Sequence, residues 1–70
     1  MNHIYSVTEI VGSSPDGTDD AIANAVAEAS KTLRNLEWFE VTSVRGKLDG
    51  DRVMHWQATI KVGFRHESGA

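Results

Sequence analysis

The chain has 70 residues, a net charge of −3 and no cysteine. We therefore expect a single domain over residues 1–70, without disulfides or thiolate-bound metal. Its seven basic residues are scattered rather than clustered, which argues against a nucleic-acid partner. The sequence contains neither an apolar run long enough to span a membrane nor an amino-terminal signal pattern, and this favours a cytoplasmic protein without a membrane partner.

The first half of the chain predicts a strand, a loop and a helix. Residues 4–11 are rich in β-branched and aromatic side chains, which are typical of a strand. Residues 12–17 concentrate turn-forming residues and predict a loop. A helix is expected from residue 18 to about residue 33, with acidic residues in its first turn and with Lys31 and Arg34 in its last. Its apolar stripe, which is mostly alanine and allows close approach to a sheet, consists of Ile22, Ala25, Val26, Ala29 and Leu33.

The second half of the chain predicts two long strands joined by a tight turn. Residues 38–48 and 52–65 alternate apolar and polar side chains, and the Asp49-Gly50 pair between them is a strong hairpin signal. In the later strand the apolar positions share one face, which we expect to be buried and which assigns Trp56 to the core. These positions are Met54, Trp56, Ala58, Ile60, Val62 and Phe64.

The element order β-α-β-β predicts an α+β fold in which one helix packs on a three-stranded antiparallel sheet. A right-handed crossover makes the first two strands parallel, and the third strand fits between them in the order 1-3-2. The helix can cover only one face of this sheet, and the other face has mixed composition. Because so small a domain is marginally stable alone, we expect the chain to self-associate.

Three side chains are candidates for ligand contacts, and each also has an ordinary structural interpretation. Trp38 can stack on a planar ring, or it can pack in a core or an interface. Gln57 can hydrogen-bond the edge of a pyrimidine-like ring, or it can face solvent or a neighbouring subunit. Arg45, directly before Gly46, can contact a phosphate, or it can be an ordinary surface arginine.

The sequence does not predict a catalytic residue or a metal site. The three histidines lack the close spacing of metal ligands and have no cysteine partners. The glycines do not form a phosphate-binding loop, and the chain has no nucleophile elbow.

Several motifs that occur in order along nearly the whole chain resemble the dodecin family. They are Glu9-Ile10-Val11-Gly12-Ser13-Ser14-Pro15, the helical segment from Ala25 to Leu33, Trp38-Phe39-Glu40-Val41, Arg45-Gly46 and the segment from Gln57 to Arg65. The resemblance implies subunits that assemble into a hollow homododecamer. It also implies that the protein is not an enzyme but binds and stores a flavin, namely FMN, riboflavin or FAD. The loop Asp16-Gly17-Thr18 is shorter than the corresponding turn of some members.

The resemblance also assigns a role to each candidate residue. It implies that Trp38 stacks on the isoalloxazine ring of the flavin, in flavin pairs at subunit junctions, and that Gln57 bonds the pyrimidine edge. Arg45 would lie near the phosphate end, which favours FMN. Some bacterial members also bind coenzyme A on the outer surface, and a set of residues near the end of the predicted helix and of the last strand resembles that site. The set is Thr32, Arg34 and Arg65.

Two other functions are compatible with a small oligomeric chain of this kind. A tautomerase also builds oligomers from short βαβ subunits, but its chemistry uses an amino-terminal proline, and the only proline here is Pro15. A structural shell or coenzyme A binder without flavin function, in which Trp38 and Gln57 only pack, stays open. A test of flavin binding distinguishes it from the flavin hypothesis.

Overall fold

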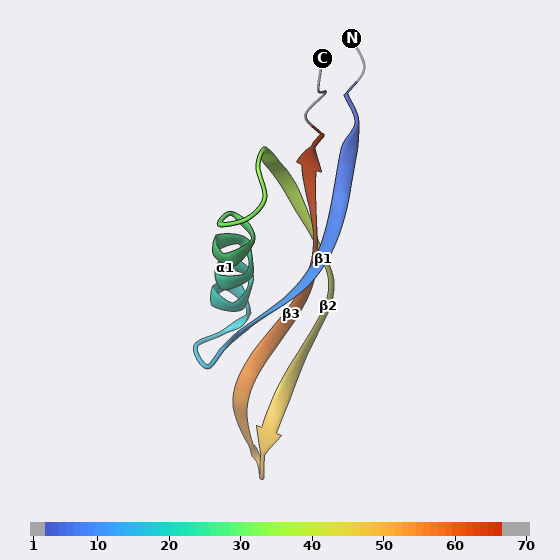
Figure 1. Ribbon diagram of the computed structural model, residues 1–70. Coiled ribbons are helices and arrows are strands. Elements are labelled where there is room, and N and C mark those ends of the chain that lie inside the picture. The colour runs from blue at the N-terminus through green and yellow to red at the C-terminus, as the bar shows by residue number, and fades with distance from the viewer. Residues whose placement is uncertain (1–2, 67–70) are drawn as a thin grey trace.

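The computed structural model describes residues 3–66 and shows a three-stranded sheet with a helix on one face (Figure 1). The elements in chain order are β1 (Tyr5–Ser14), α1 (Thr18–Ala29), β2 (Leu36–Asp49) and β3 (Arg52–Arg65). The strand order is β1-β3-β2, and β3 pairs antiparallel with both neighbours. The predicted α+β fold, the β-α-β-β order and the central place of the last strand are therefore confirmed.

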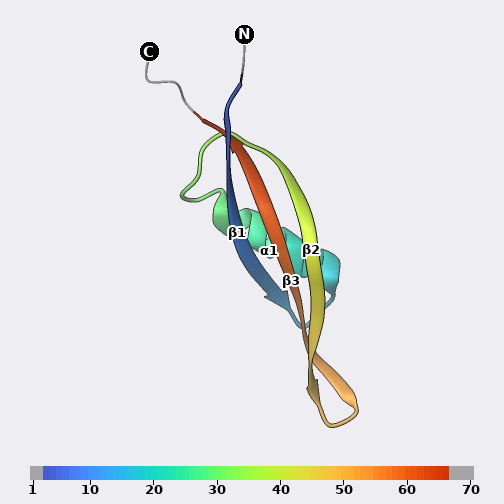
Figure 2. The ribbon, with the colours of Figure 1, turned by 90° about the vertical axis from the view of Figure 1, so that its right-hand side faces the viewer.

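The helix packs on β1 and β3, and the β2–β3 hairpin extends beyond it (Figures 1 and 2). The core between helix and sheet is small, because α1 contributes mainly alanine methyl groups to it. Alternation in β3 places three of the predicted inward side chains in this core. The buried apolar residues are Ala21, Ala25, Ala29, Ala58, Ile60 and Val62.

The first strand is longer than predicted, because residues 12–14 continue it instead of forming a loop. Gly12 pairs with Ala58, and Ser14 pairs with Trp56. The Ser14 hydroxyl is buried and donates a hydrogen bond of 2.6 Å to the Asp20 carboxylate in the first turn of α1. It also accepts a hydrogen bond of 2.9 Å from the Asp16 backbone N–H. Through these contacts Ser14 connects the end of β1 with the first turn of α1.

The helix ends at Ala29, four residues earlier than predicted, so Lys31 and Arg34 do not lie in its last turn. After Ala29 the backbone tightens, since the N–H groups of Lys31 and Thr32 bond carbonyl groups only three residues earlier. Asn35 then adopts a left-handed conformation with φ 61°, and this conformation turns the chain into β2.

The later strands are close to the prediction. β3 has the predicted bounds, whereas β2 begins two residues earlier and ends one residue later than expected. Gly50 adopts a positive φ of 64° in the turn between them, as the Asp-Gly signal predicts. Met54 is 43% exposed and Trp56 is only partly buried, whereas the alternation predicts both on the buried face. Trp56 pairs with Ser14, before α1 begins, and Met54 lies further toward the hairpin turn, beyond the part of the sheet that α1 covers.

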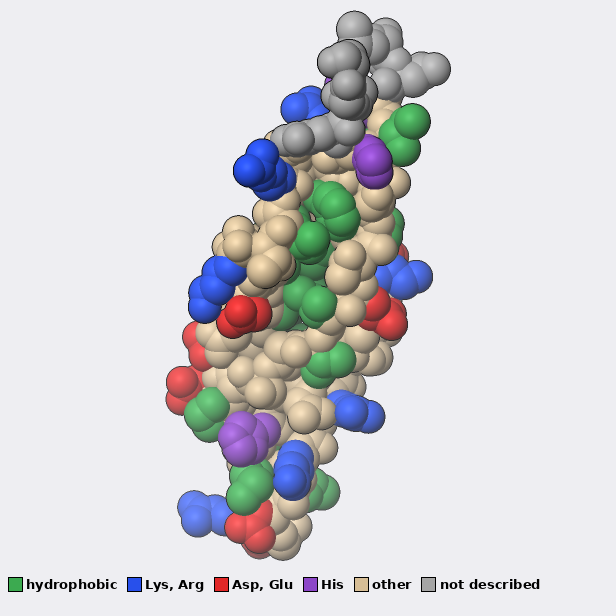
Figure 3. Space-filling model, viewed as in Figure 1, with side chains coloured by type: hydrophobic (Ala, Val, Ile, Leu, Met, Phe, Trp, Pro, Cys, Tyr) green, Lys and Arg blue, Asp and Glu red, His purple; other side chains and the backbone are tan. Residues whose placement is uncertain are grey.

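Hydrophobic side chains also gather in an open groove between α1 and the free edge of β1 (Figure 3). The groove has a volume of about 390 Å³. It is lined by Thr8, Ile10, Val11, Ala25, Glu28, Ala29, Thr32 and Leu33.

Candidate functional site

The sheet face opposite α1, called the outer face below, carries the three residues predicted to contact a flavin. Trp38 pairs with Gly63, and Arg45 pairs with Gln57, across the β2–β3 ladder. Alternation along β3 places Gln57 and Gly63 on the side away from the core residues Ala58, Ile60 and Val62. The outer face therefore brings an aromatic ring and a polar pair to one surface of the chain.

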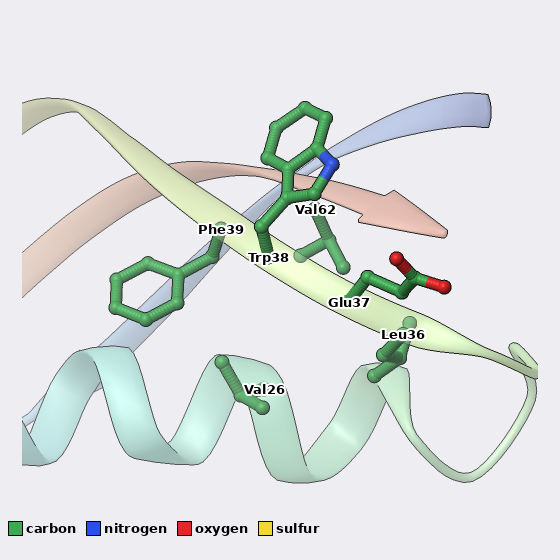
Figure 4. Close-up of a pocket in the computed structure, with 6 residues that line it drawn as sticks. All are labelled: Val26, Leu36, Glu37, Trp38, Phe39 and Val62. Atoms are coloured by element: carbon green, nitrogen blue, oxygen red, sulfur yellow. The ribbon is translucent and has the colours of Figure 1, made fainter. Parts of the chain in front are cut away.

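Trp38 lies over β3 at a point where β3 has no side chain. A Cβ atom at Gly63 would lie only 2.6 Å from Cδ2 of the Trp38 indole, so the ring occupies the space that any other residue would fill. The pairing is irregular between Leu36 and Trp38, and this irregularity turns Trp38 to the outer face while its neighbours Leu36 and Phe39 face α1 (Figure 4). The Trp38 side chain stays 43% exposed, which leaves aromatic surface for stacking.

Arg45 and Gln57 contact each other directly. The Arg45 Nε–H donates a hydrogen bond of 2.9 Å to Oε1 of Gln57. Gln57 is partly buried, whereas Arg45 is exposed. The sequence places both residues on one face, but the bond between them could not be predicted, since it depends on the strand register.

The structure does not bring Trp38 together with the Arg45–Gln57 pair within one chain. Their partners on β3, Gly63 and Gln57, are six residues apart, which corresponds to ~20 Å at about 3.3 Å per residue. A single three-ring system cannot cover that span. The indole and the Arg45–Gln57 pair of one chain are therefore two separate contact points on the outer face.

An apolar cleft between β2 and α1 adds residues that the sequence did not single out (Figure 4). It has a volume of about 180 Å³ and is lined by Val26, Leu36, Glu37, Trp38, Phe39 and Val62. Phe39 is 51% exposed, since α1 does not reach over β2. The apolar alternation of β2 already indicates an inward Phe39, but it cannot indicate that the helix leaves this residue uncovered.

Gly63 is a further residue that the sequence analysis did not identify. A glycine on the polar face of a long central strand indicates that something approaches the backbone closely at that point. In this chain the close neighbour is the Trp38 ring.

The residues that resemble a coenzyme A site do come together. Thr32, Arg34 and Arg65 line a hollow of about 270 Å³ where the chain leaves α1 and where β3 ends. The Arg65 guanidinium Nε lies 3.8 Å from a carboxylate oxygen of Glu37. The other Glu37 oxygen accepts a hydrogen bond of 3.3 Å from the Tyr5 hydroxyl. Glu37 therefore contacts both Tyr5 and Arg65 beside the hollow.

Two further features concern residues 3–66 only. In that range, no three side chains of the metal-ligating types lie close enough together to hold an ion. No helix within it is both long and apolar enough to cross a membrane.

Comparison with known proteins settles the family. The Dodecin family profile matches residues 4–67. A dodecin from Thermus thermophilus is 45% identical over 67 residues, which cover 96% of this chain and 97% of the relative. The chain belongs to the dodecin family. The predicted resemblance is thus confirmed, and it extends over almost the full length of both proteins.

Solved structures agree with this dodecin in fold. The dodecin from Streptomyces coelicolor is 59% identical and superposes with a TM-score of 0.93, over 97% of both chains. The dodecin from Streptomyces davaonensis is 56% identical with a TM-score of 0.93, over 97% of this chain and 100% of the other. Likeness at this level extends to the β2–β3 hairpin and to the placement of α1, which together shape the candidate site.

Proposed function

We propose that this dodecin binds FMN without catalysing a reaction, and that it stores and sequesters the flavin at junctions between copies in a hollow homododecamer. The observation that carries the proposal is the exposed Trp38 indole on the same face as, but ~20 Å from, the Arg45–Gln57 pair. We propose that a flat ring stacked on Trp38 of one chain meets the amide of Gln57 from another chain. Family membership supports both the flavin and the assembly.

The chemistry of the three side chains fits a phosphorylated flavin. Indole stacks on a flat aromatic system, a carboxamide offers hydrogen bonds to the edge of a pyrimidine-like ring, and a guanidinium bonds a phosphate with charge assistance. Riboflavin and FAD contain the same ring system, so they are expected to bind through the same stacking contact.

Replacement of Trp38 by alanine tests the stacking contact. Each aromatic pair that is lost removes about 0.5–1.5 kcal/mol beyond simple burial, and two indoles at each flavin pair make the loss larger. We expect quenching of FMN fluorescence to require correspondingly more protein in Trp38→Ala. Trp56→Phe, which alters the tryptophan on the helix side of the sheet, is the control and should bind FMN normally. Equal FMN affinity of Trp38→Ala and the parent would assign Trp38 to subunit packing alone.

Coenzyme A binding is a second candidate function, favoured by the hollow that Thr32, Arg34 and Arg65 share. Arginine side chains at a rim suit the phosphates of coenzyme A. We expect isothermal titration to show binding that Arg65→Ala weakens by about 1.5–3 kcal/mol, the value of a hydrogen bond to a charged group. Arg52→Ala, at the distant hairpin turn, should not change it. Identical heats for the parent and Arg65→Ala would exclude Arg65 from such a site.

A further inference from the structure

Arg45 is bonded to a neighbouring side chain and is not only a free cation on the surface. Its Nε–H donates to Oε1 of Gln57 at 2.9 Å, and the two residues are direct partners across the β2–β3 ladder. Both lie on the outer face. The contact uses the inner nitrogen of the guanidinium, so its two terminal nitrogens stay available for another partner.

The Arg45–Gln57 hydrogen bond can form in only one orientation of the Gln57 amide. A guanidinium carries donors and no acceptor, whereas a carboxamide has one acceptor oxygen and one donor nitrogen. Rotation of the Gln57 amide by half a turn would place its NH₂ against the Arg45 N–H, and the bond would be lost. Arg45 therefore selects one of the two orientations of the Gln57 amide. Within residues 3–66, Nε2 of Gln57 makes no hydrogen bond of its own.

We infer that Arg45 is a positioning residue for ring recognition: it orients the Gln57 amide so that its NH₂ group is presented to a carbonyl oxygen at the ligand's ring edge. This inference rests on the proposed flavin function. It differs from a role for Arg45 in phosphate binding, since it acts on the ring and applies equally to a flavin without a phosphate. The terminal nitrogens of Arg45 can still contact the phosphate of FMN.

Riboflavin separates these two roles because it has the ring but no phosphate. Fluorescence titration of riboflavin should show that Arg45→Ala and Gln57→Ala each weaken binding by about 2- to 10-fold, the equivalent of one neutral hydrogen bond. In the Gln57→Ala background, Arg45→Ala should cause no further loss, since the amide that it orients is gone. Undiminished riboflavin affinity of Arg45→Ala, or losses that simply multiply in the double variant, would overturn the inference.

Arg45→Lys separates geometry from charge and keeps the test available if Arg45→Ala fails to assemble. Lysine keeps the positive charge but has no N–H at the position of the arginine Nε. We expect Arg45→Lys to lose riboflavin affinity as Arg45→Ala does, while it binds FMN better than Arg45→Ala. Full riboflavin affinity in Arg45→Lys would show that charge alone suffices and would refute the positioning role.

Lys47→Ala serves as the matched control, because Lys47 is the next basic residue on the same face of β2. It should leave the affinities for both flavins unchanged. A parent protein that binds neither flavin would refute the proposed function, and the inference with it. A parent that binds riboflavin together with an unaffected Arg45→Ala variant would refute the inference alone.

Discussion

At the scale of single residues, Gly63 determines where the Trp38 ring lies. The indole lies where a Cβ atom at residue 63 would be, and residue 63 belongs to the central strand β3, which is paired on both sides. Any larger residue at this point forces the ring outward, since the strand cannot retreat. The stacking surface of the outer face therefore depends on a residue that would make no contact with the flavin itself.

Replacement of Gly63 by alanine is expected to weaken FMN binding without preventing folding. The new methyl group would lie 2.6 Å from Cδ2 of Trp38, so the ring has to move. The loss of FMN affinity should be comparable with that of one aromatic pair, about 0.5–1.5 kcal/mol. Flavin fluorescence titration measures this loss, and the intrinsic fluorescence of the protein reports the displaced indole.

Gly46→Ala provides the control, because a Cβ atom at Gly46 would have only ordinary neighbours, 3.5 Å away on His55 and 3.6 Å away on Val53. This variant should keep the FMN affinity of the parent. If Gly63→Ala behaves in the same way, the indole can move without consequence and its position over Gly63 is unimportant.

At the scale of helices and strands, the close approach of α1 to β1 determines how the helix packs on the sheet. Gly12 lies beneath the helix, where a Cβ atom would meet the carbonyl oxygen of Ala21 and lie 2.7 Å from Cβ of Ala25. Because these atoms belong to the helix backbone or to its alanine methyl groups, no side chain can rotate away. Gly12 and the alanine stripe are thus two parts of one packing contact.

Gly12→Ala should therefore destabilise the subunit by about 1–3 kcal/mol, the usual cost of overpacking. Denaturant unfolding followed by circular dichroism would show a lower midpoint for Gly12→Ala than for the parent. Gly46→Ala again serves as the comparison, with a midpoint close to that of the parent. A midpoint for Gly12→Ala equal to that of the parent would mean that α1 can shift along the sheet at little cost.

The elements also show what the sequence can and cannot predict. The alternation of β3 and the Asp49-Gly50 turn predict the hairpin and the buried face, because both depend on local spacing. The sequence pattern does not predict the observed ends of β1 and α1, since Ser14 is held in the strand by its bond to Asp20 and the chain after Ala29 is held by backbone bonds to carbonyl groups three residues earlier. Such contacts join residues whose side chains give no local signal.

The candidate site was predicted residue by residue but not as an arrangement. The family resemblance identified Trp38, Arg45 and Gln57, and the structure places all three on the outer face. The Arg45–Gln57 bond and the support of Trp38 by Gly63 depend on strand register, which side-chain periodicity leaves undefined. The uncovered apolar surface on the helix side of β2 was not foreseen either, because it depends on which strands α1 covers.

At the scale of the whole molecule, the chain is more extended and exposes more surface than a compact monomer of its length. Its Cα radius of gyration is 14.6 Å, whereas a compact chain of this length has about 11 Å. Its accessible surface is 5200 Å², compared with about 4300 Å² for a folded monomer of this mass. The large exposed hydrophobic residues on both sheet faces and at the hairpin are Ile4, Tyr5, Val7, Val11, Trp38, Phe39, Val41, Val44, Leu48, Val53 and Met54.

Apolar surface is exposed on both sheet faces and at the hairpin, so covering all of it requires contacts with more than one neighbouring molecule. A two-fold dimer would cover a single patch, whereas a closed assembly of many copies covers each patch with a different neighbour. Large uncovered patches of this kind mark protein interaction sites. The shape of the subunit thus supports the assembly proposed above, in which a flavin between copies would contact Trp38 of one chain and Gln57 of another.

Sedimentation velocity in the presence of FMN, recorded at the flavin absorbance band, tests this account most directly. We expect the flavin to travel with a single boundary whose mass is twelve times that of the chain, because the proposed site lies where copies meet. In Trp38→Ala, the protein absorbance should still show the twelve-chain boundary, whereas the flavin absorbance should no longer sediment with it. A monomer or dimer at micromolar concentration, or a twelve-chain assembly that leaves FMN behind, would contradict the account.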